Sequence, residues 1–138
     1  MVTRAACLVL ALAACSEAEP GGWDGLDRNE RIAFMEDEVL PRMTAIFAEH
    51  DPQRFASFAC ESCHGIDMID ADYEMPHALT ALPLDDTLEV AQARNPEMTA
   101  LMLDDVFPVM VELLGADKYN EQTAPDGLRC TICHLVAP

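Results

Sequence analysis

The sequence has few basic residues: 8 lysines and arginines face 25 aspartates and glutamates, which gives a formal net charge of −17 at pH 7. Nucleic acid is excluded as a partner, because its phosphates must be met by lysine and arginine. No apolar run approaches the ~20 residues that a membrane-spanning helix requires. Alternating β-branched segments are also scarce, whereas Ala, Leu, Met and Glu are abundant. This composition favours an all-α fold over a small β fold.

The first residues have the pattern of an export signal. Arg4 precedes an apolar segment that is too short to cross a bilayer, and Cys15 follows directly after Leu12-Ala13-Ala14. This ending resembles a bacterial lipobox, where the signal is removed before the cysteine and the cysteine then carries lipid. The other interpretation is ordinary cleavage near Ala14, with Cys15 incidental. We predict a signal peptide over 1–14, lipid attachment at Cys15, and an exported, periplasmic protein anchored to a bacterial membrane.

A flexible tether is predicted over 15–26, because this segment combines acidic residues, a proline and three glycines around the lone Trp23. Such a tether would let an anchored domain stand off a membrane. Trp23 would either contact a partner or pack back on the domain. The remaining residues, 27–138, are predicted to form one domain.

Four of the six cysteines form two Cys-x-x-Cys-His motifs, at 60–64 and 130–134. This is the covalent attachment pattern of c-type haem. Thiols about one helical turn apart lie on one helix face and reach the two vinyl groups at one edge of the porphyrin, and the histidine that follows projects toward the iron. The sequence therefore predicts two covalent haem c groups. The thioether links would form at Cys60, Cys63, Cys130 and Cys133, and the proximal iron ligands would be His64 and His134.

Two other chemistries use paired cysteines. Four thiolates can hold a structural zinc ion, and exported cysteines can form disulfides. Neither alternative explains why a histidine follows the second cysteine of both motifs. Covalent haem explains both histidines.

The two halves of the chain resemble each other. Residues 34–43 align with residues 101–110 at a constant offset of 67, with matches at Met, Asp, Val, Pro and Met. The motifs are offset by 70, so the second half has three extra residues in its intervening loop. We therefore expect two pseudo-repeated helix–loop–haem-helix units, over about 27–66 and 95–138, packed around two covalently bound haems.

Local signals predict where the two long helices lie. Asp27 with Glu30 forms a capping box before a long apolar pattern, and Asn95-Pro96 is a typical start for the corresponding helix of the second half. Pro41 and Pro108 fall inside these patterns. Each proline removes a backbone donor, so we expect a kink or a new helix at each.

Shorter helices are expected at the motifs and between the two halves. Asp51 is expected to cap the helix that bears the first motif, and Gly65 to end that helix. Asp126 is the candidate cap for the second motif helix. Residues 85–94 are a further short helix candidate.

A haem iron usually takes a sixth ligand, either a methionine sulfur or a histidine nitrogen. Two sites built by one repeat are most simply served by repeated residues. Met43 and Met110 lie 17 and 20 residues before the first cysteine of their motifs, which suits a long helix that folds back across the haem. We predict these two as axial ligands. Three alternatives stay open. Either the methionines serve only as core packing; or a histidine, His50 or His77, binds at least one iron; or the other repeated pair, Met35 and Met102, supplies the ligands.

This order of elements, a methionine helix followed by a Cys-x-x-Cys-His helix and then repeated, resembles the multihaem cytochrome subunit of photosynthetic reaction centres. The closest part is Met43-Thr44-Ala45, an aromatic-containing stretch, and Cys60 to Gly65; the resemblance covers 30–65 and 96–134. It implies an all-helical fold in which each methionine helix runs along a haem plane, a lipid-anchored N-terminus, and electron transfer on the periplasmic side. The chain has two haem motifs where that family has four.

Filled axial positions leave no open site for a substrate, so the sequence predicts an electron carrier rather than an enzyme. Its partners are expected to be redox proteins with a basic docking face, because acidic runs stand at 36–38, 85–86 and 104–105. The alternatives are a small dihaem reductase or peroxidase with one open iron, and a zinc-binding interaction module.

Overall fold

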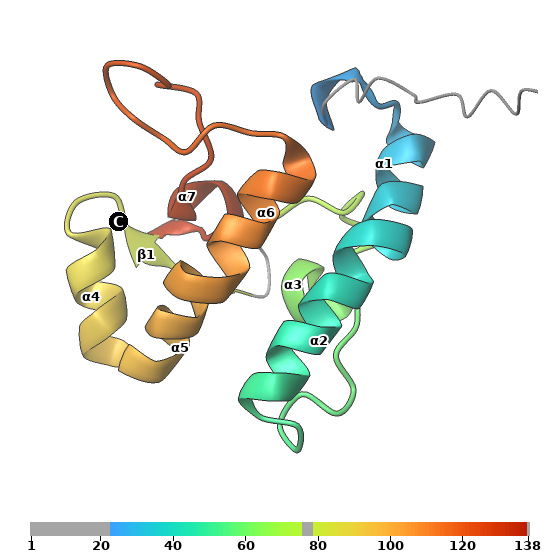
Figure 1. Ribbon diagram of the computed structural model, residues 1–138, viewed down its shortest axis with the longest axis horizontal. Helices are drawn as coiled ribbons and strands as arrows, with labels where there is room; N and C mark the ends of the chain where they lie inside the picture. The colour runs from blue at the N-terminus through green and yellow to red at the C-terminus, as the bar shows by residue number, and fades with distance from the viewer. Residues whose placement is uncertain (1–22, 76–78, 138) are drawn as a thin grey trace, which may run out of the picture.

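The computed structural model describes residues 23–75 and 79–137, and the chain is mostly helical there (Figure 1). The predicted all-α fold class is thus confirmed. The predicted signal peptide, Cys15, the first part of the tether and His77 lie outside the described residues. Within the described ranges, every helix is too short or too polar to cross a bilayer.

The first helical arm, residues 28–50, runs without a break through α1 (Arg28–Phe34), a π-helical turn η2 (Met35–Val39) and α2 (Leu40–His50). It begins with the predicted capping box. The Asp27 carboxylate accepts from the backbone N–H groups of Asn29 and Glu30, and the Glu30 carboxylate accepts from the Asp27 N–H at 2.8 Å. These bonds satisfy donors that the first turn of a helix otherwise leaves unpaired.

Replacing Asp27 with alanine is expected to destabilise the protein by about 1 kcal/mol, the usual cost of a lost N-cap. Chemical denaturation of the mature protein, followed by helix circular dichroism, measures the change. The matched control is Asp37→Ala, at an exposed position inside the same arm. Equal effects of the two variants would show that the cap at Asp27 contributes nothing specific.

The end of the predicted tether packs on this arm. Trp23–Gly25 forms a short 3-10 helix, η1. The Trp23 ring lies edge-on to Phe34, with ring centroids 6.1 Å apart, and the Arg31 guanidinium lies 5.0 Å from the Trp23 centroid. Of the two roles expected for Trp23, packing back on the domain is the one observed.

The second helical arm, residues 96–114, consists of α5 (Pro96–Leu101), a π-helical turn η3 (Met102–Val106) and α6 (Phe107–Leu114). The Asn95 side chain accepts from the Met98 N–H at 3.1 Å, so the predicted cap is confirmed. The expected short helix before it is α4 (Thr87–Arg94).

In each arm the π-helical turn ends two residues before a proline. The Leu40 N–H donates to the Met35 carbonyl, and the Phe107 N–H donates to the Met102 carbonyl, five residues back in both cases. We expected a kink or a new helix at Pro41 and Pro108, and a new α-helix does begin at each: α2 starts at Leu40 and α6 at Phe107, with the proline in the first turn. In a regular α-helix the proline ring clashes with the carbonyl four residues earlier, and a wide turn relieves this clash.

The two arms pack side by side and run antiparallel, since α2 contacts η3 and α6 contacts η2 (Figure 1). Apolar side chains recurring every three to four residues form their interface. Its buried centre is Val39, Met43, Phe47 and Leu101. Among the described residues, no large side chain is less than 2 % exposed. The polypeptide alone therefore forms only a thin core.

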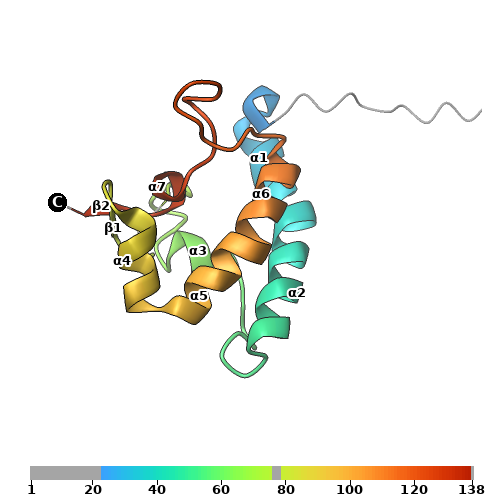
Figure 2. The same cartoon turned by 60° about the vertical axis from the view of Figure 1, so that its left-hand side comes forward.

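The cysteine motifs lie on two single-turn helices, α3 (Glu61–His64) and α7 (Cys130–Cys133). Figure 2 shows both on the same side of the layer formed by α2 and α6. Two short strands, β1 (Leu82–Pro83) and β2 (Val136–Ala137), pair in parallel and join the segments that follow the two motifs. No pattern in the sequence indicated this pairing.

Two expected caps are wrong. The Asp51 carboxylate accepts from the N–H groups of Gln53 and Arg54 and so caps a turn, and the motif helix starts only after that turn ends. The second motif helix is preceded by Arg129 rather than Asp126, without a side-chain cap. Both acidic residues lie too far ahead of these helices, since Glu61 is ten positions after Asp51 and Cys130 is four after Asp126, whereas an N-cap directly precedes the first helical residue. Gly65 does end α3, with a φ of 90° that favours glycine.

Candidate haem sites

The first motif forms the single turn that haem attachment requires. The His64 N–H donates to the Cys60 carbonyl at 2.9 Å, and the Gly65 N–H donates to the Glu61 carbonyl at 2.9 Å. Cys60 and Cys63 are three positions apart on this turn, so both thiols lie on one face. Both cysteines are partly exposed, which leaves them accessible to a porphyrin edge.

The second motif repeats this geometry with one difference. The His134 N–H donates to the Cys130 carbonyl at 2.9 Å, as in the first motif. His134 itself has extended backbone, with φ −106° and ψ 136°, because the helix ends one residue earlier. Cys130 is exposed and Cys133 is half-buried.

Both motif histidines are oriented by a backbone carbonyl. His64 Nδ1 lies 2.9 Å from the Tyr73 carbonyl oxygen, and His134 Nδ1 lies 2.9 Å from the Thr80 carbonyl oxygen. A carbonyl only accepts, so Nδ1 carries the proton in each ring and Nε2 keeps its lone pair. Metal-binding histidines are typically held in this way, since the second hydrogen bond fixes the tautomer and ring orientation.

The four motif cysteines are free thiols, so the disulfide alternative is not observed. Burial raises the pKa of the Cys63 thiol to about 11, with smaller contributions from Cys133 and Cys60. Burial also raises the pKa of Cys133 and, together with nearby Glu36 and Glu61, that of Cys60. Because their pKa values are raised, the thiols of Cys60, Cys63 and Cys133 stay protonated at neutral pH.

The zinc alternative needs four converging thiolates. Over 23–75 and 79–137, no three histidine, cysteine or acidic side chains are grouped closely enough to hold a metal ion. A haem iron needs no such group, because it takes only one side chain on each face. Among the described residues, the four motif thiols therefore do not converge as a four-thiolate zinc site requires.

Apolar side chains beside both motifs are exposed. Ile66 is 92 % and Ile69 70 % exposed just after the first motif. Ile132, Leu135 and Val136 are each about half exposed around the second. Exposure of so many large apolar groups near two attachment sites is costly in water. A porphyrin ring at each motif is an apolar surface of the right kind to cover them.

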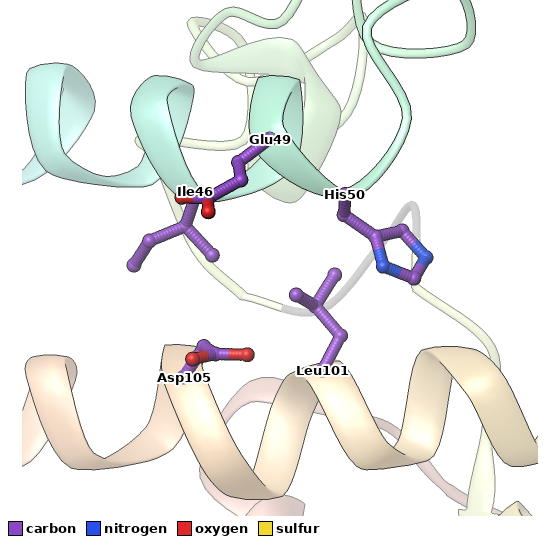
Figure 3. Close-up of a pocket in the computed structure, with 5 residues that line it drawn as sticks. All are labelled: Ile46, Glu49, His50, Leu101 and Asp105. Carbon is purple, nitrogen blue, oxygen red and sulfur yellow. The ribbon is translucent and has the colours of Figure 1, made fainter.

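Two cavities among the described residues lie away from the motifs. One, of about 200 Å³, lies between α2 and the second arm, where His50 and Leu101 face one another across the gap (Figure 3). Its other lining residues are Ile46, Glu49 and Asp105. The second, of about 320 Å³, is bounded mainly by the loop after α6. No motif residue lines either cavity, so a porphyrin would lie against an open face.

The candidate axial ligands lie in the interface between the arms. Met43 is 5 % exposed at its centre, and Met110 packs partly buried against the same cluster. Met35 and Met102, the alternative pair, pack against it as well. The assignment of Met43 and Met110 therefore stays a prediction. His50 is exposed at the end of α2, at the cavity of Figure 3.

An aromatic cluster fixes the segment before the first motif. Phe58 stacks on Phe47 of α2, with ring centroids 4.5 Å apart, and Phe55 meets the same ring edge-on at 4.8 Å. Because Phe58 precedes Cys60 by two residues, this cluster ties the first motif to the helix that carries Met43.

No family model, curated protein or solved structure matched this chain. The assignment of the site therefore depends on its own chemistry. The acceptors at Tyr73 and Thr80 were not predicted, because a backbone carbonyl leaves no residue-type signal in a sequence.

Proposed function

We propose that this protein is an exported, lipid-anchored c-type cytochrome with two covalent haems, which passes single electrons between redox partners. The observation that carries the proposal is the matching position and hydrogen bonding of His64 and His134. Each follows a turn that presents two thiols, and each has Nδ1 bonded to a carbonyl, so that Nε2 is free for iron. A zinc or disulfide role gives no reason for this matched orientation.

The residues have distinct roles in this proposal. Haem c supplies one-electron chemistry when it is bound. Cys60, Cys63, Cys130 and Cys133 hold it covalently, and His64 and His134 orient their Nε2 atoms toward it. Met43 and Met110 are the proposed opposite ligands, which would leave no position for a substrate. Both motif turns lie on the same side of the layer formed by α2 and α6 (Figure 2), so the two haems would share one face of the protein.

A pseudo-repeat accounts for the matching halves. The π-helical turns η2 and η3 occupy the same place in both arms, each ending two residues before a proline, at the offset of 67 found in the sequence. Both motifs also hold their histidines in one way. We infer two related units, each built from one methionine arm and one haem turn.

The charge distribution favours a basic partner. Within the described residues, Arg28 with Asp72 is the one salt bridge found. Four other basic side chains lie over aromatic rings instead: Arg31, Arg54, Lys118 and Arg129. Most carboxylates are therefore uncompensated, including the exposed runs 36–38 and 104–105. Their summed field would steer an electropositive redox protein toward this surface, with a strong dependence on salt.

The test is a haem count. The full chain, produced in a bacterium that matures c-type cytochromes, is expected to be red and to gain the mass of two haems by intact mass spectrometry. A pyridine haemochrome spectrum should show thioether-linked haem in the same ratio, and the mass also reports cleavage before Cys15 and its acylation. Colourless protein, or protein with the mass of the bare polypeptide, would refute the proposal.

A further inference from the structure

The loop that accepts the His64 hydrogen bond is fixed by an arginine from the first arm. Arg28 Nε donates to Asp72 Oδ1 at 2.6 Å, and Arg28 Nη2 contacts the same oxygen. The guanidinium also lies 5.9 Å from the centroid of the Tyr73 ring. Arg28 thus holds both Asp72 and Tyr73, and the carbonyl of Tyr73 is the one that orients His64.

This loop needs such a restraint. Asp72 and Tyr73 have φ values of 53° and 60°, in the left-handed region that side chains other than glycine rarely adopt. Two adjacent residues in this conformation persist only when the surroundings enforce it. The Tyr73 N–H donates to the Met68 carbonyl at 2.7 Å, and Arg28 adds the restraint from outside the loop.

The second site has a corresponding arginine. Arg94, at the end of α4, donates through Nη1 to the Ala81 carbonyl at 2.8 Å. Ala81 directly follows Thr80, whose carbonyl orients His134. The Leu82 N–H then donates to the Leu135 carbonyl at 2.8 Å, which ties the same segment to the residue after His134.

We propose that Arg28 and Arg94 are positioning residues, each holding the loop segment whose carbonyl orients the proximal histidine of one haem, so that the two reduction potentials are set separately. The inference rests on the proposed function. Stability is a poor explanation for the Arg28–Asp72 pair, because both side chains are more than half exposed and exposed ion pairs contribute little. A firm Nδ1–H bond makes the imidazole a stronger electron donor and so favours oxidised iron.

The test replaces each arginine with lysine, which keeps the charge but lacks the planar fork of donors. In Arg28→Lys the Nδ1 bond of His64 should loosen, and the affected haem should become easier to reduce. The expected change is about threefold to tenfold in the ratio of reduced to oxidised haem at a fixed ambient potential, where tenfold equals about 59 mV. Arg94→Lys should shift the other haem, and the double variant should shift both.

Two further measurements separate positioning from a general structural effect. Exchange of the Nδ1 proton with solvent, followed by NMR, should accelerate for one histidine in each single variant. The matched control is Arg54→Lys, since Arg54 lies 5.1 Å from the Phe55 centroid, on a ring outside the two carbonyl loops. It should change neither potential.

The possible failures are distinguishable. A wild-type protein without haem would overturn the proposed function, and this inference with it. A protein with two haems whose potentials and Nδ1 exchange do not change in Arg28→Lys and Arg94→Lys would overturn this inference alone. Equal shifts in Arg54→Lys would also overturn it, because the effect would then not depend on the loop contacts.

Discussion

Replacing Cys60 with alanine is expected to remove firmly held haem and cooperative folding together. The arms share only four buried apolar side chains, and no large described side chain is less than 2 % exposed. A chain of this size buries too little by itself and needs additional cross-links or cofactors. A haem joined at both thiols would supply apolar surface and a covalent link in one group.

The loss is expected to be about 3 kcal/mol or more, the scale of a covalent cross-link in a small domain. Thermal unfolding, absorbance and intact mass of Cys60→Ala measure stability and haem content on one sample. Cys133→Ala should behave in the same way at the second site. Glu61→Gln is the matched control, because Glu61 is exposed between the two motif cysteines and is expected to leave attachment intact. A stable, cooperatively folded and colourless Cys60→Ala protein would contradict this expectation.

Local interactions explain what could be predicted of the fold. The capping box at Asp27 and the cap at Asn95 involve bonds within three residues, so the sequence displays them directly. The apolar periodicity of the arms likewise belongs to one helix at a time. The Cys-x-x-Cys-His turns form as expected because a single helical turn fixes their geometry.

What the sequence did not reveal depends on contacts between distant segments. The β1–β2 pairing joins residues more than fifty positions apart. The acceptors at Tyr73 and Thr80 are backbone groups, which every residue carries, so their selection depends on the path of the chain. The π-helical turns were missed for another reason: a proline signals that a helix is kinked or begins anew, but not which wider turn accommodates its ring.

Replacing Met43 with leucine is expected to leave the fold intact while changing the iron. Met43 is 5 % exposed between the arms, and leucine has a similar volume, so the packing cost should stay below about 1.5 kcal/mol. Leucine has no sulfur, however, and cannot bind iron. The variant should lose, on one haem, the weak red absorption band of the bond between methionine sulfur and iron. It should gain high-spin features, because one coordination position of that iron becomes open.

The potential of that haem should fall, since methionine favours reduced iron. A decrease of at least about 59 mV, a tenfold change in the reduced-to-oxidised ratio, is expected in a redox titration. Met110→Leu should produce the same changes at the other haem. The open iron should also bind small ligands that the wild-type protein excludes, which would support the proposal that filled axial positions suit this protein to electron transfer.

Met35→Leu and Met102→Leu are the matched controls, because both side chains pack against the same apolar cluster. These two variants lose the same sulfur atom and change shape in a similar way, so an effect that all four variants share must come from packing. An effect on the red band in Met43→Leu and Met110→Leu alone would identify the axial pair. If the band instead disappeared in Met35→Leu and Met102→Leu, the ligands would lie two helical turns earlier in each arm. A band unchanged by all four substitutions would contradict methionine ligation from this repeat altogether.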